Sequence, residues 1–351
     1  MHEANVSMAS YPWYERGGMS VYEHGAAFNI FLPPLWLALR FLPSSMSVWW
    51  FAAWIGIIIY QVRTTVTPER KKLQPYLHVC LPMYAASLML AMVAEQPLHA
   101  AALTAVLVVA KVGLCMSVCL HRYAAHGAFK CGWLTNVGLC LVGCLANQGG
   151  PIWWGSKHRC HHKFCDRGRD PHSPLQAGCI DAFQFHTLKA HKATDEEFRP
   201  HHADCFAARL IDTFSFVPVS LELILSYTLC GPGGLWVSYA SGVLSQSLAL
   251  WFNVMNHPPH QKTADHPCAS VDSANYVVPE DYQSIMAPNL LFGAINTCVW
   301  VAQLTGEGAH DHHHDHAALA RRPGVDLPYH LMVRPLHAMG LIWAVKLPKP
   351  Q

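Results

Sequence analysis

The sequence predicts an all-α integral membrane protein, with four core transmembrane helices, a hydrophobic hairpin before them, and a histidine-rich helical cap on the cytosolic face. Charged residues make up 13% of the 351 residues, about half of the roughly 25% usual in soluble domains. Several apolar segments approach the roughly 20 residues that a helix needs to cross the hydrocarbon layer. Three histidine clusters lie next to such segments, which places polar chemistry at a membrane surface.

The first 62 residues divide into a polar segment, 1–25, and a predicted hydrophobic hairpin, 26–62. The polar segment has no basic stretch followed by an apolar core, so we expect no cleaved signal peptide. The first arm of the hairpin is short and contains Pro33 and Arg40. The hairpin therefore fits either a kinked pair of spans or an element that lies in the membrane interface.

The core spans are expected at 75–95, 100–120, 210–230 and 234–253. Their orientation follows from the basic residues, because short cytosolic loops are enriched in Lys and Arg. The link at 63–74 contains four such residues, whereas the other short links contain none. Each later pair of spans returns the chain to the side of this link. We therefore expect all the histidine clusters to face the cytosol.

Two shorter apolar stretches, 132–146 and 286–304, directly precede the second and third histidine clusters. Their lengths fit interfacial or re-entrant helices. Since no flexible or charged linker interrupts the region, 75–346 is predicted to form one membrane domain that includes the cap.

Charge and cysteine content narrow the class of protein. A net charge of only +2 provides no electrostatic footprint for nucleic acid. The 13 cysteines form no Cys-x-x-Cys pair, and several lie in apolar stretches, where thiols act as small hydrophobic groups. Cys160 and Cys165 lie in or beside a histidine cluster, where a disulfide would obstruct a metal site. We therefore expect reduced thiols in a cytosol-like compartment.

Nine histidines form the candidate metal site: His121, His126, His158, His161, His162, His257, His310, His313 and His314. Residues three and four apart share one face of a helix, so each triplet can converge on one side. His121 and His126 are five apart, about 140° around an α-helix. Either they approach a metal from different angles, or His126 lies just past the helix end, where Gly127 permits a turn.

The number of imidazoles favours two metal ions, because one zinc ion takes only three or four protein ligands. The Glu-x-x-His signature of di-iron carboxylate bundles is absent from the sequence. An all-histidine pair of irons is therefore the preferred interpretation. Asn253 lies four residues before His257, on the same helical face, and is predicted to hold a metal through a water molecule.

Polar residues near the clusters could orient the ligand rings by accepting their N–H groups. The candidates are Asp166, Asp170, His172 and Glu307. For the three acidic residues, solvated loop positions are the alternative interpretation.

The boxes His121–His126, Lys157–Asp166 and Gly306–His314 resemble those of the membrane fatty acid desaturases. The stretch from Gln148 to Pro174 is most similar to the stearoyl-CoA (Δ9) branch. The resemblance covers residues 75 to about 346. It implies two iron ions (Fe2+/Fe3+) held by the nine histidines, with Asn253 in the water-holding position. It also implies O2-dependent insertion of a cis double bond at Δ9 into a long-chain acyl-CoA or acyl-lipid.

The resemblance places Gln148 at the bend of an acyl tunnel, and Trp153, Trp154 and Trp251 are candidates for its walls. Trp at a membrane boundary is also a common interfacial anchor. Lys189 and Lys192 are possible contacts to a phosphorylated head group, or else part of a solvated basic surface. Electrons are expected from a separate protein of the cytochrome b5 or ferredoxin type. The membrane would be the endoplasmic reticulum in a eukaryote or the inner membrane in a bacterium.

The histidine pattern leaves two alternative functions open. A fatty acyl hydroxylase could use the same histidine set. A histidine-rich zinc transporter could also carry such clusters, but it should place ionisable ligands within its spans. The predicted spans are nearly free of them, and the exceptions His78 and Glu222 lie near ends or stand alone.

Overall fold

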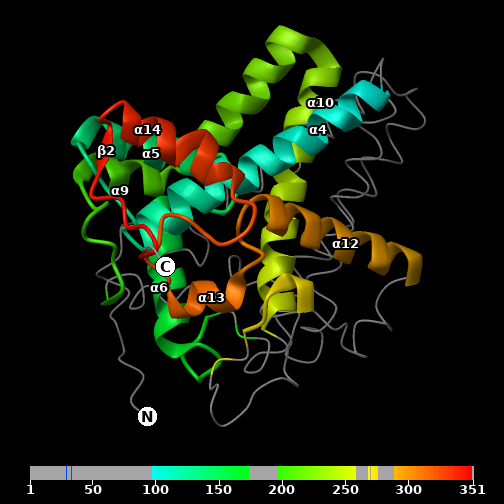
Figure 1. The fold of residues 1–351 in the computed structure, drawn as a ribbon. Helices are drawn as coiled ribbons and strands as arrows, with labels where there is room; N and C mark the ends of the chain where they lie inside the picture. Colours follow the sequence, from blue (N-terminus) through cyan, green and yellow to red (C-terminus); the bar gives the residue numbers. More distant parts are fainter. Residues whose placement is uncertain are drawn as a thin grey trace.

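The computed structural model describes residues 97–171, 173, 197–257, 268, 270–275 and 288–349, together with Asn29 and Pro33. The described part is mostly helical, with one two-stranded sheet (Figure 1). This confirms the helical prediction. The polar segment 1–25, nearly all of the hairpin 26–62 and the predicted span 75–95 lie outside the described residues.

Two helices in the described part are long and apolar enough to cross a membrane. The first, Leu98–Ala125, has 28 residues and combines α4 (Pro97–Ala110) with the π-helix η5 (Lys111–Ala125). The second is α10 (Phe216–Asn256), with 41 residues. The predicted span 100–120 lies within the first helix. The predicted count of four core spans is not reached among these residues.

The predicted spans 210–230 and 234–253 correspond largely to the two arms of α10, which reverses direction at a sharp bend near its middle (Figure 1). Gly231 has a φ of 64° there, a conformation that glycine adopts without steric cost. Pro232 follows and lacks the backbone N–H that a continuous helix needs. Leu229, just before the bend, has 78% of its surface exposed, as expected for a side chain that faces lipid.

An ion pair joins the two long helices within their apolar length. Lys111 Nζ lies 2.8 Å from Glu222 Oε1, and the Ser238 hydroxyl donates to the same carboxylate over 2.9 Å. The expectation that Glu222 stands alone was therefore wrong. The sequence hid this contact because the partners are 111 residues apart, and a buried charge in an apolar region is stabilised by a partner.

Shorter helices pack against the two long ones or against one another (Figure 1). They are α5 (Trp133–Cys144), α6 (Pro151–Phe164), α9 (Phe206–Thr213) and α12 (Pro288–Leu304). Helices α5 and α12 correspond to the predicted stretches 132–146 and 286–304. The helix α6 follows Gly150, and the Asp212 carboxylate accepts the Ile152 and Trp153 N–H groups over 2.8 and 2.9 Å. Asp212 thus satisfies backbone donors that a helix N-terminus leaves unpaired.

The Asp212 contact yields a stability prediction. Asp212→Ala should lower the unfolding free energy by about 1 kcal/mol, since removing an N-terminal helix cap typically has this effect. Asp212→Asn should retain most of the stability, because its amide oxygen can still accept. Thermal unfolding of the full chain in detergent measures both changes. Equal melting temperatures for the alanine variant and the wild type would contradict the role of this carboxylate.

The C-terminal region folds back onto the start of the cap. It contains η7 (Ser273–Asn275), α13 (His310–Asp315), η8 (Tyr329–Val333) and α14 (Arg334–Ala338). Strand β2 (Ile342–Trp343) then pairs antiparallel with β1 (Lys130–Cys131). The Lys346 N–H donates to the Ala128 carbonyl over 2.9 Å. These contacts fix the chain after α13 against the segment that follows η5.

Candidate metal centre

The first histidine pair is positioned by the unusual winding of η5. In a π-helix the backbone hydrogen bonds join residues five apart, and the His126 N–H donates to the His121 carbonyl over 3.2 Å. The two rings consequently lie 5.1 Å apart, centre to centre. The calculation for an α-helix, which separated them by about 140°, does not apply. His126 does lie just past the helix end, and Gly127 follows it with a φ of 55°.

The two histidine triplets do not each converge on a single point. In α6, His158 and His162 turn toward one group, and His161 turns toward another. In α13, His310 and His314 turn toward the group of His161, and His313 turns toward the group of His158 and His162. Residues four apart are closest in direction around a helix, so in each helix the pair at i and i+4 stays together.

The result is two adjacent groups of histidines. The five-histidine group consists of His121, His126, His158, His162 and His313. The four-histidine group consists of His161, His257, His310 and His314, with ring centres about 5 Å apart in the contacts that join them. All nine predicted histidines are thus brought together.

The distances between ring nitrogens suit ligands of a shared metal. His313 Nε2 lies 2.8 Å from His121 Nε2 and 2.9 Å from His162 Nε2. In the other group, His257 Nε2 and His310 Nε2 are 3.0 Å apart. Two nitrogens that each lie about 2.1 Å from one ion, at right angles, are separated by about 3 Å. The buried His126 Nε2 and His314 Nε2 have no hydrogen-bond partner among the described residues, so the donor set fits metal ions.

Burial keeps these rings in the form that binds metals. It lowers the pKa of His126, His158, His162, His310, His313 and His314 well below the usual value, and the neighbouring histidines disfavour a charge on each ring further. The pKa of His257 is also lowered by burial, although Asp166 opposes the shift. Neutral imidazoles have a free lone pair for coordination.

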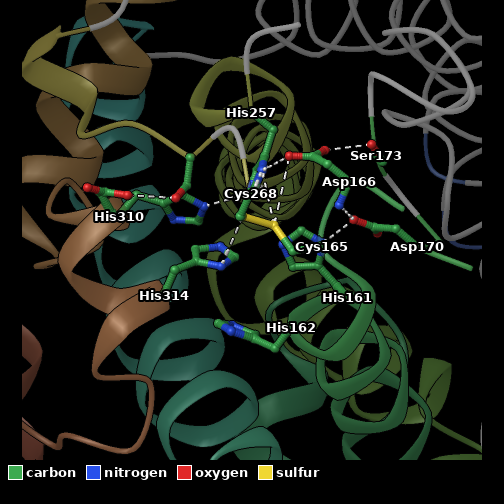
Figure 2. The surroundings of a disulfide bond; sticks show 12 residues. His161, His162, Cys165, Asp166, Asp170, Ser173, His257, Cys268, His310 and His314 are labelled. Carbon is green, nitrogen blue, oxygen red and sulfur yellow. Dashed lines mark hydrogen bonds and ion pairs between the residues drawn. A yellow bond between two sulfur atoms is a disulfide. The ribbon is translucent and has the colours of Figure 1, made fainter. Parts of the chain in front are cut away.

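Three carboxylates hold the outward nitrogens of the rings. His121 Nδ1 lies 2.8 Å from Glu307 Oε2, and His161 Nδ1 lies 2.8 Å from Asp170 Oδ2. Figure 2 shows the same arrangement for His257, whose Nδ1 lies 3.2 Å from Asp166 Oδ2. Such contacts fix the tautomer so that the other nitrogen can coordinate. The acidic residues singled out in the sequence therefore touch predicted ligands, while His172 lies outside the described residues.

Sequence reasoning missed a buried charge network behind Glu307. Arg122 Nη1 lies 2.8 Å from Asp326 Oδ2 and its Nη2 lies 3.8 Å from Glu307 Oε1, while Ser117 donates to Glu307. Burial alone would raise the pKa of Glu307, but His121, Arg322 and Arg122 outweigh it and lower the pKa far below its usual value. Glu307 is therefore an ionised acceptor for His121. Arg122 lies within the first histidine box, and this position could have drawn attention to it. No local pattern marks Arg322 or Asp326.

A cavity of about 40 Å³ adjoins His121, His158 and His310. Among the predicted tunnel residues, Gln148 and Trp154 line it, as does Asn253. The Trp154 indole N–H donates to Gln148 Oε1 over 3.1 Å. This volume exceeds the roughly 10–15 Å³ that one water molecule needs.

The other predicted substrate contacts lie elsewhere. Trp153 packs in the apolar cluster between η5 and α6, and Trp251 lies on α10. Neither lines this cavity. Lys189 and Lys192 lie outside the described residues.

The expectation of reduced thiols was wrong for one pair. Cys165 and Cys268 form a disulfide between residues 103 apart in sequence, beside the four-histidine group (Figure 2). The sulfurs face the outward nitrogens of the rings, since Cys268 Sγ lies 3.6 Å from His314 Nδ1. The Cys165 sulfur lies within 4.8 Å of a ring nitrogen of His161, His257 and His314. The other cysteines in the described part, Cys160 included, are free.

Comparison with known proteins identifies relatives. No protein family model matches the chain. It is 30% identical over 254 residues to a hex-5-enoyl-[acyl-carrier protein] acetylenase of Moorena producens, with 66% of this chain and 73% of that protein covered. It is 28% identical over 244 residues to an icosanoyl-CoA 5-desaturase of Limnanthes douglasii, covering 66% and 61%. It is 27% identical over 251 residues to the chloroplastic palmitoyl-monogalactosyldiacylglycerol delta-7 desaturase of Arabidopsis thaliana, covering 66% and 58%.

Proposed function

Because this chain belongs to the fatty acid desaturase family, and is thus an oxidoreductase, we propose that it inserts a cis double bond into a long-chain fatty acyl substrate. The reaction uses O2, two iron ions and electrons from a separate donor protein. One observation carries the proposal: nine histidines gather into two groups where η5 and α10 end beside α6 and α13, with facing nitrogens 2.8–3.0 Å apart.

The histidines and the carboxylates have different roles in this reaction. Bound iron would supply the O2 chemistry that removes hydrogen from an unactivated methylene, which no side chain can do alone. The five-histidine group and the four-histidine group would each hold one ion. Glu307, Asp170 and Asp166 keep a proton on the outward nitrogen of His121, His161 and His257, so that the other nitrogen offers its lone pair.

The substrate would reach the irons through the cavity beside Asn253. Its apolar lining includes Met116, Leu250 and Phe252, which suits a hydrocarbon chain, and Asn253 and Gln148 add polar groups near the histidines. An acyl chain is much longer than this cavity, so the space between η5 and α10 must widen when substrate binds. Placing one pair of carbons beside the centre is a positioning task.

Several finer features belong to the proposal. We assign Δ9 regiospecificity on the resemblance of Gln148–Pro174, whereas two of the compared relatives are named as 5- and delta-7 desaturases. Acyl-CoA or acyl-lipid is the proposed carrier, with Lys189 and Lys192 as head-group contacts. The histidine groups face the cytosol, where a donor of the cytochrome b5 or ferredoxin type can reach them.

Expression of the chain in a host that lacks fatty acid desaturases tests the proposal. Gas chromatography with mass spectrometry of total lipids should show a new cis-monounsaturated acid, and derivatisation should place its double bond at Δ9. His161→Ala provides the inactive control. A new hydroxy acid in place of the olefin would overturn desaturation, and unchanged lipids with zinc accumulation would favour the transporter alternative.

A further inference from the structure

The disulfide Cys165–Cys268 ties together three elements that carry the four-histidine group. Cys165 directly follows α6, which carries His161. Beyond Cys268, the Val271 N–H donates to the Asn256 carbonyl over 2.9 Å, next to His257 at the end of α10. Segment 270–275 also reaches α13, since the Ser270 hydroxyl donates to Asp311 Oδ1 over 2.8 Å. The cross-link therefore fastens this segment and α6 around one set of rings (Figure 2).

We propose that Cys165 and Cys268 form a reversible thiol–disulfide clasp that controls the exchange of metal at the four-histidine group. This proposal depends on the proposed function in one respect only, namely that the bound metal is iron. Closed as a disulfide, it holds His161, His257 and His314 in place. Opened by reduction, it releases the segment from α6 and lets the metal leave or enter faster.

The surroundings of Cys165 and Cys268 favour a reversible disulfide over a permanent one. Nine other cysteines in the described part are free, which is typical of a reducing compartment, where a disulfide is usually transient or redox-sensing. Cys268 is partly exposed while Cys165 is buried. A reductant would therefore approach the pair from the side of Cys268.

A dithiol reductant opens the disulfide, and hydrogen peroxide closes it. The thiolate of a dithiol attacks the Cys268 sulfur, the S–S bond breaks, and Cys165 leaves as a thiolate that takes up a proton. The second thiol of the reductant then releases Cys268 as a thiol, and the reductant ends as a disulfide. In the reverse direction, the two thiols and one molecule of hydrogen peroxide give the disulfide and two molecules of water.

The redox state is also linked to the orientation of His257. Asp166 Oδ2 lies 3.2 Å from His257 Nδ1 and 3.8 Å from Cys165 Sγ. In the reduced state the Cys165 thiol becomes a donor that competes with His257 for this carboxylate. Reduction thus weakens the contact that fixes the ring.

The experiment uses the full chain in detergent, treated while metal-free with either peroxide or dithiothreitol. The reagent is then removed, and both forms are loaded anaerobically with Fe2+. Mass spectrometry should find a linked Cys165–Cys268 peptide only after peroxide. Release of Fe2+ to a colorimetric chelator should be at least about tenfold slower in the disulfide form, because a cross-link between distant residues strongly suppresses local opening. Cys268→Ser should abolish the difference, and Cys160→Ser, in the helix α6 that directly precedes Cys165, should preserve it.

Absence of the linked peptide after peroxide, or equal release rates in the two states, would overturn the clasp. The result can be separated from the proposed function. A chain that binds no iron in either state would contradict the di-iron proposal, while the linked peptide and the release of Zn2+ to a zinc-sensitive dye would still test the clasp.

Discussion

Replacing His313 with alanine is expected to reduce desaturation by at least about a hundredfold, since even the residues that orient metal ligands are worth about 10–100-fold in activity or metal affinity. His313 Nε2 lies within 2.9 Å of both His121 and His162, so its ring joins the ligands of η5 to those of α6. Lipid analysis in the desaturase-deficient host measures activity, and metal analysis of purified protein should show fewer than two irons per chain.

His312→Ala is the matched control. His312 is next in sequence, but its ring lies 4.7 Å from that of His316, outside both histidine groups. This variant should retain activity and iron content. Size-exclusion chromatography of both variants checks that each remains folded in detergent. Full turnover by His313→Ala would remove the central ligand from the assignment and with it the proposed site.

Local sequence patterns predicted the positions of several helices but not their winding or their rotation. Helices α5 and α12 agree with the stretches 132–146 and 286–304 within a few residues, because a run of apolar residues between turn residues is a local signal. The π-helical winding of η5 has no such signal. Helical spacing showed that His158, His161 and His162 lie near one another, but their division between two groups depends on how α6 is rotated against α13.

Partners close in sequence to the ligands were accessible to prediction, and distant partners were not. Asp170 lies only nine residues after its partner His161. Asp166 was singled out because it ends the second histidine box, although the ring that it contacts is that of His257. Arg322 acts on Glu307 through its charge, and its backbone N–H donates to Asp326, so its place depends on how the chain folds after α13. Cys268 meets Cys165 across 103 residues, a contact that depends on the whole arrangement of α6, α10 and α13.

The buried charges around Glu307 lead to the second large expected effect. Two arginines, Arg122 and Arg322, balance Glu307 and Asp326, and all four side chains are nearly inaccessible to solvent. Burial lowers the pKa of Arg322 to about 10, and Arg122 adds to this effect against Glu307 and Asp326. Glu307→Gln should therefore leave one uncompensated positive charge and cost about 3–5 kcal/mol of stability. Activity should also fall about 10–100-fold, because His121 loses its charged partner.

A second substitution separates charge balance from simple loss of a contact. Glu307→Gln combined with Arg322→Met removes one charge of each sign, so it should recover much of the lost thermal stability but not the activity. Glu197→Gln breaks an exposed pair with Arg169 and should change stability by less than about 1 kcal/mol. Thermal unfolding in detergent and lipid analysis measure the two effects separately. The contrary result is a loss of stability in the double variant that equals the sum of the losses in Glu307→Gln and Arg322→Met measured alone. In that case the two charges do not balance one another, and Glu307 acts only through its hydrogen bonds to His121 and Ser117.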